Sequence, residues 1–235
     1  MGGWLMDLSY LLDVQLTDEE LQAARARLAA GPALKVDVWG GRKEDVLHLV
    51  DYALAVRAAR REDYAAAGAL YARLGAAQRA ARMKAAERLH DAIGEAAGGD
   101  PERRLAYASF LADHPAQLFF NDSLWEGFQR YALLGKTGDE GGEAPALLDE
   151  EQRRALLENE RRFQDAQEER WRAFQIFDAV AREAGHSALG RRAALKALEC
   201  LVQLADNSRF GRTAEIRAAR RRLTAWLRET AAEAS

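Results

Sequence analysis

Helical periodicity runs through almost the whole chain and constrains its fold more than any other feature. From Lys43 to Arg60 the apolar residues recur three and four positions apart, and later segments repeat this spacing. Only four prolines interrupt the pattern, while Ala, Leu, Arg and Glu, all strong helix formers, dominate it. We therefore predict an all-α fold, a right-handed stack of about nine or ten antiparallel helices without a real β-sheet.

Capping and breaking signals divide this pattern into segments. Thr17 and Glu20 form a capping box at the start of one helix, which ends before Gly31. Asp100 and Pro101 are typical of the start of another helix, which ends near residue 113. Residues 33–39 alternate apolar and polar side chains, but a lone strand would have no partner, so we expect a connector there. The other expected helices cover residues 4–13, 43–60, 64–74, 76–97, 123–134, 149–184, 187–205 and 213–232.

A stretch rich in glycine and acids separates two halves of the sequence. Residues 135–148 carry no apolar periodicity, which is typical of an exposed loop. We therefore expect an N-terminal helical part over residues 1–134 and a C-terminal helical part over residues 149–235.

Three segments place small and large apolar residues at the same spacing. In the first, EDYAAAGALYARLG, the small residue Ala67 lies between Tyr64 and Tyr71 on one helical face. Ala55, twelve residues earlier, supplies a second small residue where two helices of a tight hairpin would meet. The repeated triplets are Ala67, Tyr71 and Leu74; Ala173, Phe177 and Val180; and Ala219, Leu223 and Trp226.

Pairing of large and small residues across a tight helical hairpin resembles the design of tetratricopeptide (TPR) repeats. The resemblance covers residues 43–75 and 165–228. The Trp-Leu-Gly signature of the first repeat helix is missing, and no proline ends the units. The resemblance implies a TPR-like α-solenoid, a non-enzymatic scaffold or adaptor whose partner is another protein. An ordinary Ala-rich helical bundle is the alternative.

Charge is distributed unevenly along a chain whose formal net charge is only -3. Residues 135–170 contain eleven acids and six bases, whereas residues 185–235 contain ten bases and five acids. Three explanations are open: two solvated helix faces, pairing within the fold between the acids of residues 149–169 and the arginines of the last helix, and a basic surface that binds an acidic or extended partner segment. The low net charge argues against a general nucleic-acid binder.

No motif with a known chemistry is present. The four histidines stand singly without metal-ligand spacing, and the GKTG at 135–138 lacks the rest of a phosphate-binding loop. The one cysteine, Cys200, lies among apolar residues, so a buried and inert thiol is expected. We therefore predict no catalytic residue, no metal and no cofactor. A helical enzyme or small-ligand-binding protein with a site between helices remains an alternative.

Three groups of residues are candidates for partner binding. Trp125 and Tyr131 belong to the most aromatic stretch, residues 118–131, for which core packing is the alternative. The loop DNSRFGR places an apolar side chain between two cations, and the last helix carries an arginine cluster opposite its apolar face. A nucleic-acid contact through this basic helix is a further alternative. The arginines and the phenylalanine of these two groups are Arg209, Phe210, Arg212, Arg217, Arg220 and Arg221.

The N-terminal residues contain no basic leader and no membrane span, and Asp7 and Asp13 interrupt their apolar pattern. This favours the cytoplasm, although the initial Met-Gly-Gly is also compatible with a trimmed exported chain.

Overall fold

A computed structural model describes residues 8–37, 43–94, 99–125, 168–205 and 213–233, together with residues 150, 151, 154, 163 and 166. Over these residues the chain forms nine helices and one two-stranded ribbon, so the all-α prediction is confirmed. Two compact units can be distinguished. Unit 1 comprises residues 1–87 and 117–163, and unit 2 comprises residues 88–116 and 164–235.

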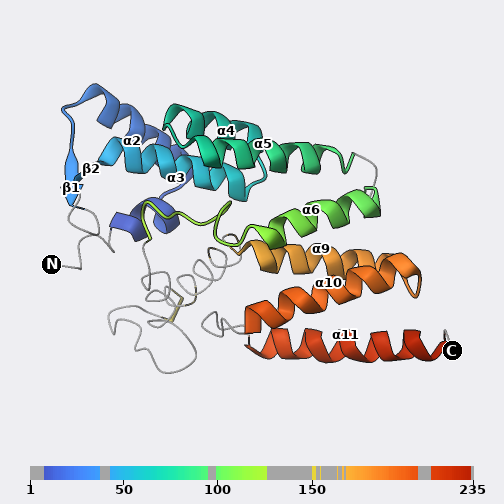
Figure 1. Cartoon of the computed structure of the whole chain (residues 1–235). Coiled ribbons are helices and arrows are strands. Elements are labelled where there is room, and N and C mark those ends of the chain that lie inside the picture. Colours follow the sequence, from blue (N-terminus) through green and yellow to red (C-terminus); the bar gives the residue numbers. More distant parts are fainter. Residues whose placement is uncertain are drawn as a thin grey trace. The chain divides into compact units, whose positions relative to one another are not determined.

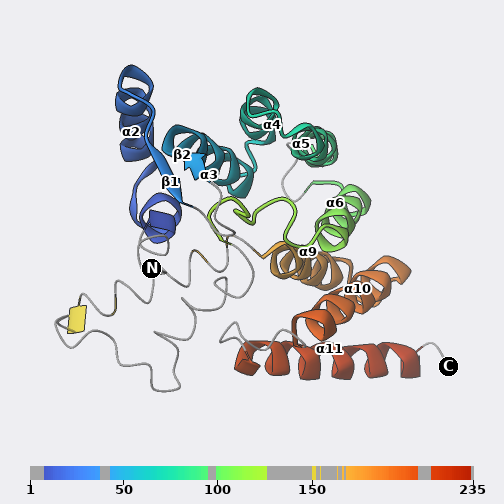
Figure 2. The same cartoon turned by 60° about the vertical axis from the view of Figure 1, so that its left-hand side comes forward.

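Unit 1 begins with a one-turn π-helix and continues through a series of α-helices (Figure 1). Helix α4 lies beside α5, and both views show α3 next to α4 (Figures 1 and 2). The turn between α3 and α4 occupies only residues 61–63, as expected for a tight hairpin. The elements are η1 (Leu11–Gln15), α2 (Asp18–Ala30), β1 (Lys35–Asp37), β2 (Lys43–Asp45), α3 (Val46–Arg60), α4 (Tyr64–Arg73) and α5 (Ala77–Asp91), of which α5 belongs to unit 1 up to Glu87.

Side-chain caps fix where the helices of unit 1 begin. The predicted capping box is present, since the Thr17 hydroxyl accepts a hydrogen bond from the Glu20 amide and the Glu20 carboxylate accepts one from Thr17. Asp45 caps α3 by accepting from the Leu47 amide, and Asp63 caps α4 by accepting from the Ala66 amide. Local polar residues therefore satisfy backbone donors that the first turn of each helix leaves unpaired.

The expectation that residues 33–39 form an unpaired connector is wrong. Strand β1 pairs antiparallel with β2, with Val36 opposite Glu44. The partner strand is the charged triplet Lys-Glu-Asp, which lacks any apolar alternation and therefore gives no strand signal in the sequence. Each strand has only three residues, so the ribbon does not change the fold class.

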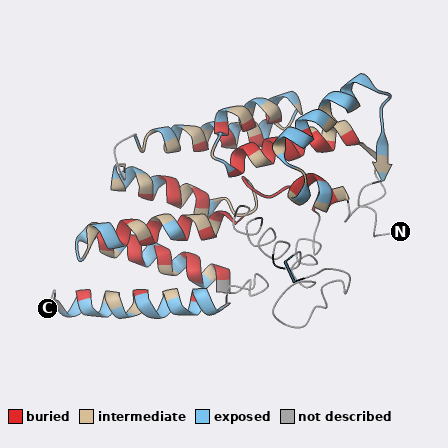
Figure 3. Cartoon of the chain, turned by 180° about the vertical axis from the view of Figure 1, so that it is seen from behind, coloured by how far each residue is buried: buried red, intermediate tan, exposed pale blue. Residues whose placement is uncertain are grey.

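The core of unit 1 is built around α3. This helix is buried on nearly all sides (Figure 3). Ala53, Ala55 and Val56 are completely inaccessible to solvent. Helix α4 buries the face that the spacing predicted, because Tyr64, Ala67 and Tyr71 are its buried residues. Helices α4 and α5 approach each other closely at Gly68, where an added Cβ would be in van der Waals contact with the Met83 Cβ at 3.4 Å.

Unit 2 consists of helices that pack in chain order. Its elements are the last turn of α5, then α6 (Pro101–Asp113), α9 (Glu169–Ala184), α10 (Ala188–Ala205) and α11 (Thr213–Glu233). Helix α6 packs on α9, α9 on α10, and α10 on α11 (Figure 1). Asp100 caps α6 as predicted, by accepting from the Glu102 amide. A Cβ at Gly190 would lie 1.9 Å from the Gly185 carbonyl oxygen, so the start of α10 requires a glycine there.

The core of unit 2 confirms the burial of the second triplet. Ala173, Phe177 and Val180 are all fully buried on α9. On α11 the third triplet is only partly enclosed, since Leu223 is buried while Ala219 and Trp226 are half-buried. Ala193, Ala194 and Ala197 let α10 approach its neighbours closely.

The division into two units depends on packing between residues that are far apart in the sequence. Residues 88–116 belong to unit 2 together with the C-terminal helices because α6 packs on α9. This contact joins residues far apart in the sequence, so local patterns do not predict it. The expected boundary loop at residues 135–148 lies outside the described residues, so its role stays a prediction. In the described part of the chain, no helix combines the length and the apolar character needed to cross a membrane.

Candidate functional site

Helix α11 presents a row of arginines on its outer face. Most of α11 is exposed (Figure 3). Arg217, Arg220, Arg221 and Arg228 are all exposed, whereas Ile216 of the same helix is buried. Because side chains three, four and seven positions apart share a face, the four guanidinium groups point to one side. At a rise of about 1.5 Å per residue, the row from Arg217 to Arg228 is ~16 Å long.

Their neighbour Arg222 is paired within unit 2. Its Nη2 atom lies 2.7 Å from Asp178 Oδ1 on α9, and the same carboxylate also lies 2.8 Å from the Nη2 atom of Arg182. Asp178 is buried and therefore holds the flank of α11 against α9 through a charge-assisted contact. Arg222 is therefore a structural residue, although its partner Asp178 lies outside the acidic stretch of residues 149–169 from which internal pairing was expected.

The outer row has no such partner in the part of the chain that the structure describes. No ion pair or hydrogen bond of Arg217, Arg220, Arg221 or Arg228 occurs there. Two acids of α11, Glu215 and Glu229, lie on another edge of the helix than the row. They are in line with Arg222, because positions seven apart share one edge. We call these four residues, Arg217, Arg220, Arg221 and Arg228, the basic face of α11.

The acids of residues 149–169 are the ones expected to neutralise this face from within the fold, and the structure describes only some of them. Glu168 and Glu169 are buried at the start of α9, and Glu169 accepts a hydrogen bond of 2.9 Å from the Ala116 amide. Glu150 and Glu151 are exposed. The other acids of residues 149–169 lie outside the described residues, so internal pairing through them stays an alternative.

Comparisons do not decide what this surface does. No family model, curated protein or solved structure matches the chain. The resemblance to TPR repeats therefore continues to depend on the three triplets and their hairpins alone.

The remaining predicted site residues divide into one buried residue and several that lie outside the described residues. The structure corrects the prediction for Trp125, which is buried and donates a hydrogen bond of 2.7 Å from its indole nitrogen to Asp13. Core packing, the alternative for this aromatic stretch, therefore applies to it. Tyr131, Arg209, Phe210 and Arg212 lie outside the described residues.

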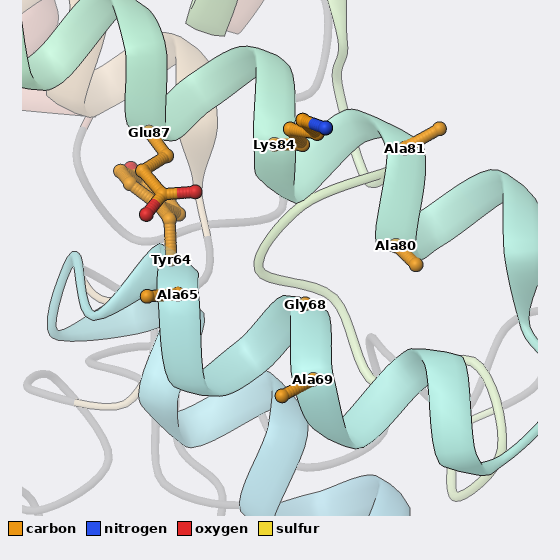
Figure 4. Close-up of a pocket in the computed structure, with 8 residues that line it drawn as sticks. All are labelled: Tyr64, Ala65, Gly68, Ala69, Ala80, Ala81, Lys84 and Glu87. Atoms are coloured by element: carbon orange, nitrogen blue, oxygen red, sulfur yellow. The ribbon is translucent and has the colours of Figure 1, made fainter.

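A shallow hollow of about 380 Å³ lies between α4 and α5. Its wall is mostly small and apolar, with Tyr64 and Glu87 together at one end (Figure 4). One carboxylate and one lysine line it, and no histidine does, which is a poor basis for acid–base chemistry. The lining residues are Tyr64, Ala65, Gly68, Ala69, Ala80, Ala81, Lys84 and Glu87.

A buried polar cluster in unit 1 was not anticipated from the sequence. The guanidinium of Arg79 lies 5.5 Å from the ring centre of Tyr52 and 5.6 Å from that of Tyr71. Arg79 also forms an ion pair of 2.9 Å with Asp122, which accepts a hydrogen bond of 2.5 Å from the Tyr52 hydroxyl. Burial raises the pKa of Tyr52 well above its ordinary value, and the hydrogen bond to Asp122 adds to this effect against the opposing charge of Arg79.

Tyr71 makes this cluster sensitive to alkaline pH. Burial raises the pKa of Tyr71 from 10.0 to about 12, although the positive charge of Arg79 opposes the shift. Above pH 10 the unfolded chain loses the phenolic proton while the folded protein keeps it, so the free energy of unfolding falls as the pH rises from 10 to 12. Two pKa units correspond to about 3 kcal/mol for this residue.

We therefore expect Tyr71→Phe to lose less of its stability than the wild type over this pH window. Urea unfolding followed by circular dichroism at pH 9, 10, 11 and 12 measures the difference. At pH 9 the phenol is neutral in both the folded and the unfolded state, so the difference between the two proteins at pH 9 gives the cost of removing the hydroxyl itself. Parallel curves for the two proteins up to pH 12 would show that Tyr71 ionises normally in the folded state.

The histidines and the cysteine occupy structural positions in the described part of the chain. Each histidine lies beside an aromatic ring: His48 by Tyr52, His90 by Tyr107, His114 by Phe110 and His186 by Trp226. No group of three potential metal ligands occurs among the described residues. Cys200 is buried as predicted, and burial raises the pKa of its thiol to about 12, which disfavours the reactive thiolate.

The sequence analysis did not identify one residue of the basic face, Arg228, or the buried arginines Arg60 and Arg79. Arg228 could have been found, because it lies seven positions after Arg221 and continues the same row. Arg60 and Arg79 gave no comparable signal, since each looks like an ordinary solvated residue of a helix and is buried only by partners far away in the sequence.

Proposed function

We propose that the protein is a non-enzymatic adaptor that binds an acidic segment of another protein through the basic face of α11. TPR-like helical hairpins form the scaffold on which this face is presented. The observation that carries the proposal is the contrast on one helix: Arg222 is paired with Asp178, whereas the outer row is exposed and unpaired within the described residues.

The chemistry of the basic face favours carboxylates. Four aligned arginines repel one another by a few tenths of a kcal/mol per pair, and this repulsion is relieved when acids lie opposite them. Guanidinium groups bind carboxylates with two parallel hydrogen bonds, which adds geometric specificity. Along the described residues of α11, no aromatic side chain on which nucleic-acid bases could stack lies within the row, since Trp226 lies beside His186 on the opposite side of the helix.

We expect Arg217→Glu, Arg220→Glu and Arg221→Glu, introduced together, to weaken binding of a fluorescein-labelled oligoglutamate probe by about tenfold or more. Fluorescence anisotropy measures the affinity. The melting temperature should change little, because none of the three side chains makes a stabilising contact in the described structure. Binding by the wild type should weaken with added salt.

The matched control reverses two exposed bases of unit 1, Arg27→Glu and Arg73→Glu, and is compared with the double variant Arg217→Glu, Arg220→Glu, which changes the net charge equally. An equal loss of probe binding in the control would refute a specific role for α11. Loss of thermal stability without loss of binding would favour internal pairing instead. Tighter, steeply salt-dependent binding of duplex or single-stranded DNA would replace the proposal with a nucleic-acid contact.

A further inference from the structure

A buried irregular segment runs through unit 1. Residues 117–125, which we call the return segment, bring the chain back to unit 1 after α6 and contain neither helix nor strand. Leu118, Phe119 and Asn121 are nevertheless completely inaccessible to solvent. A buried irregular backbone cannot satisfy its polar groups in the regular way, so its partners must come from elsewhere.

Arginine side chains of two helices bind the backbone of the return segment. Arg60 on α3 donates from Nε to the Phe119 carbonyl at 2.8 Å, and Arg79 on α5 donates from Nη1 to the Phe120 carbonyl at 3.2 Å. Both arginines are themselves buried. Proteins that recognise extended peptides use the same kind of contact. Hydrogen bonds to the peptide main chain contribute affinity for any sequence, and pockets around the peptide side chains contribute specificity.

An acidic residue fixes the end of this stretch at the surface. The Asp122 side chain is 55% exposed, yet its carboxylate accepts from the Tyr52 hydroxyl and pairs with Arg79. Arg79 lies against both tyrosine rings, which hold its guanidinium in place. The contact made by Asp122 is therefore charge-assisted and accessible to competing carboxylates, unlike the buried aromatic contacts before it.

We infer that Tyr52, Arg60, Tyr71 and Arg79 form a binding site for an extended peptide with two aromatic residues followed by an acid. In this chain the site is occupied in cis by the return segment, whose residues Phe119, Phe120 and Asp122 have this chemistry. A peptide of the same kind supplied in trans competes with the return segment. An added peptide binds only those molecules in which the return segment has left the site, so its apparent affinity is reduced in proportion to their fraction. A substitution that weakens the contacts of the return segment should therefore strengthen binding of the added peptide.

The test uses the full chain, wild type and Asp122→Ala, with a labelled peptide that corresponds to residues 117–125. We expect Asp122→Ala to bind this peptide at least tenfold more tightly than the wild type does, measured by fluorescence anisotropy. A control peptide with lysine in place of the aspartate should bind weakly, because it cannot pair with Arg79. Equal affinity of the two peptides for Asp122→Ala would overturn the inference.

Hydrogen exchange of the return segment completes the test. Backbone amides of residues 117–125 should exchange faster in Asp122→Ala than in the wild type, and peptide binding should not restore their protection. If exchange is unchanged and no peptide binds, the segment is a fixed part of the core and the inference is wrong. If exchange rises but no peptide binds, the four residues are not a peptide site, and the inference is equally wrong.

Discussion

Replacing Asp13 by asparagine should destabilise the protein by about 3–5 kcal/mol, the range expected when one member of a buried ion pair is removed. The Asp13 side chain is completely buried and forms two contacts with Arg60, at 2.7 and 3.1 Å. It also accepts the indole hydrogen bond of Trp125. Asparagine can keep some of these hydrogen bonds, but the Arg60 guanidinium would then remain in the interior without an opposing charge.

The free energy of unfolding in urea, followed by circular dichroism, measures this effect. The double variant Asp13→Asn, Arg60→Met removes both charges, so we expect it to be less destabilised than the sum of the two single variants. Additive costs would show that the two side chains do not interact across the core. A cost of less than about 1 kcal/mol for Asp13→Asn would mean that water reaches the pair.

The helices could be predicted because their signals are local. Thr17 and Glu20 satisfy each other across one helical turn, and Asp100 acts on an amide two residues away. The face of α4 followed from the spacing of Tyr64 and Tyr71 alone. Each of these features depends on residues within a few positions, so a single sequence contains the information needed.

The polar core of unit 1 depends on contacts across long distances in the sequence. Asp13 reaches Arg60 from 47 residues away and Trp125 from 112 residues away. An isolated aspartate in the apolar stretch LLDVQL is unusual, but nothing near it identifies its partners. The same limitation applies to β2, whose charged residues pair with β1 without any pattern of their own.

The candidate site was only partly predictable for the same reason. The row formed by Arg217, Arg220 and Arg221 follows from helical spacing, because the side chains share a face whatever packs behind them. The sequence could not separate Arg222 from that row, since its role depends on Asp178 of another helix. Arg222 pairs with a buried carboxylate and therefore stabilises the fold. The remaining arginines are exposed, and they alone form the surface proposed to bind a partner.

The largest expected effect in unit 2 is that of Phe177→Ala, at about 3–5 kcal/mol. Phe177 is completely buried on α9, which packs against both α6 and α10. Removing the ring leaves a cavity that helices on two sides cannot fill without moving away from their other contacts. The cost therefore combines lost burial of apolar surface with the cavity itself.

Phe177→Ala also examines the second of the three repeated triplets, because Ala173 and Val180 are buried on the same face. Urea unfolding gives the change in free energy, and hydrogen exchange should show faster exchange of the amides of α9 and α10. Gln175→Ala on the exposed face of α9 is the control, and we expect it to stay within about 0.5 kcal/mol of the wild type. Similar small costs for the two variants would contradict a packed face around Phe177. They would also remove the second triplet from the argument for TPR-like hairpins, because in such a hairpin the large residue beside a small one must fill the space between helices.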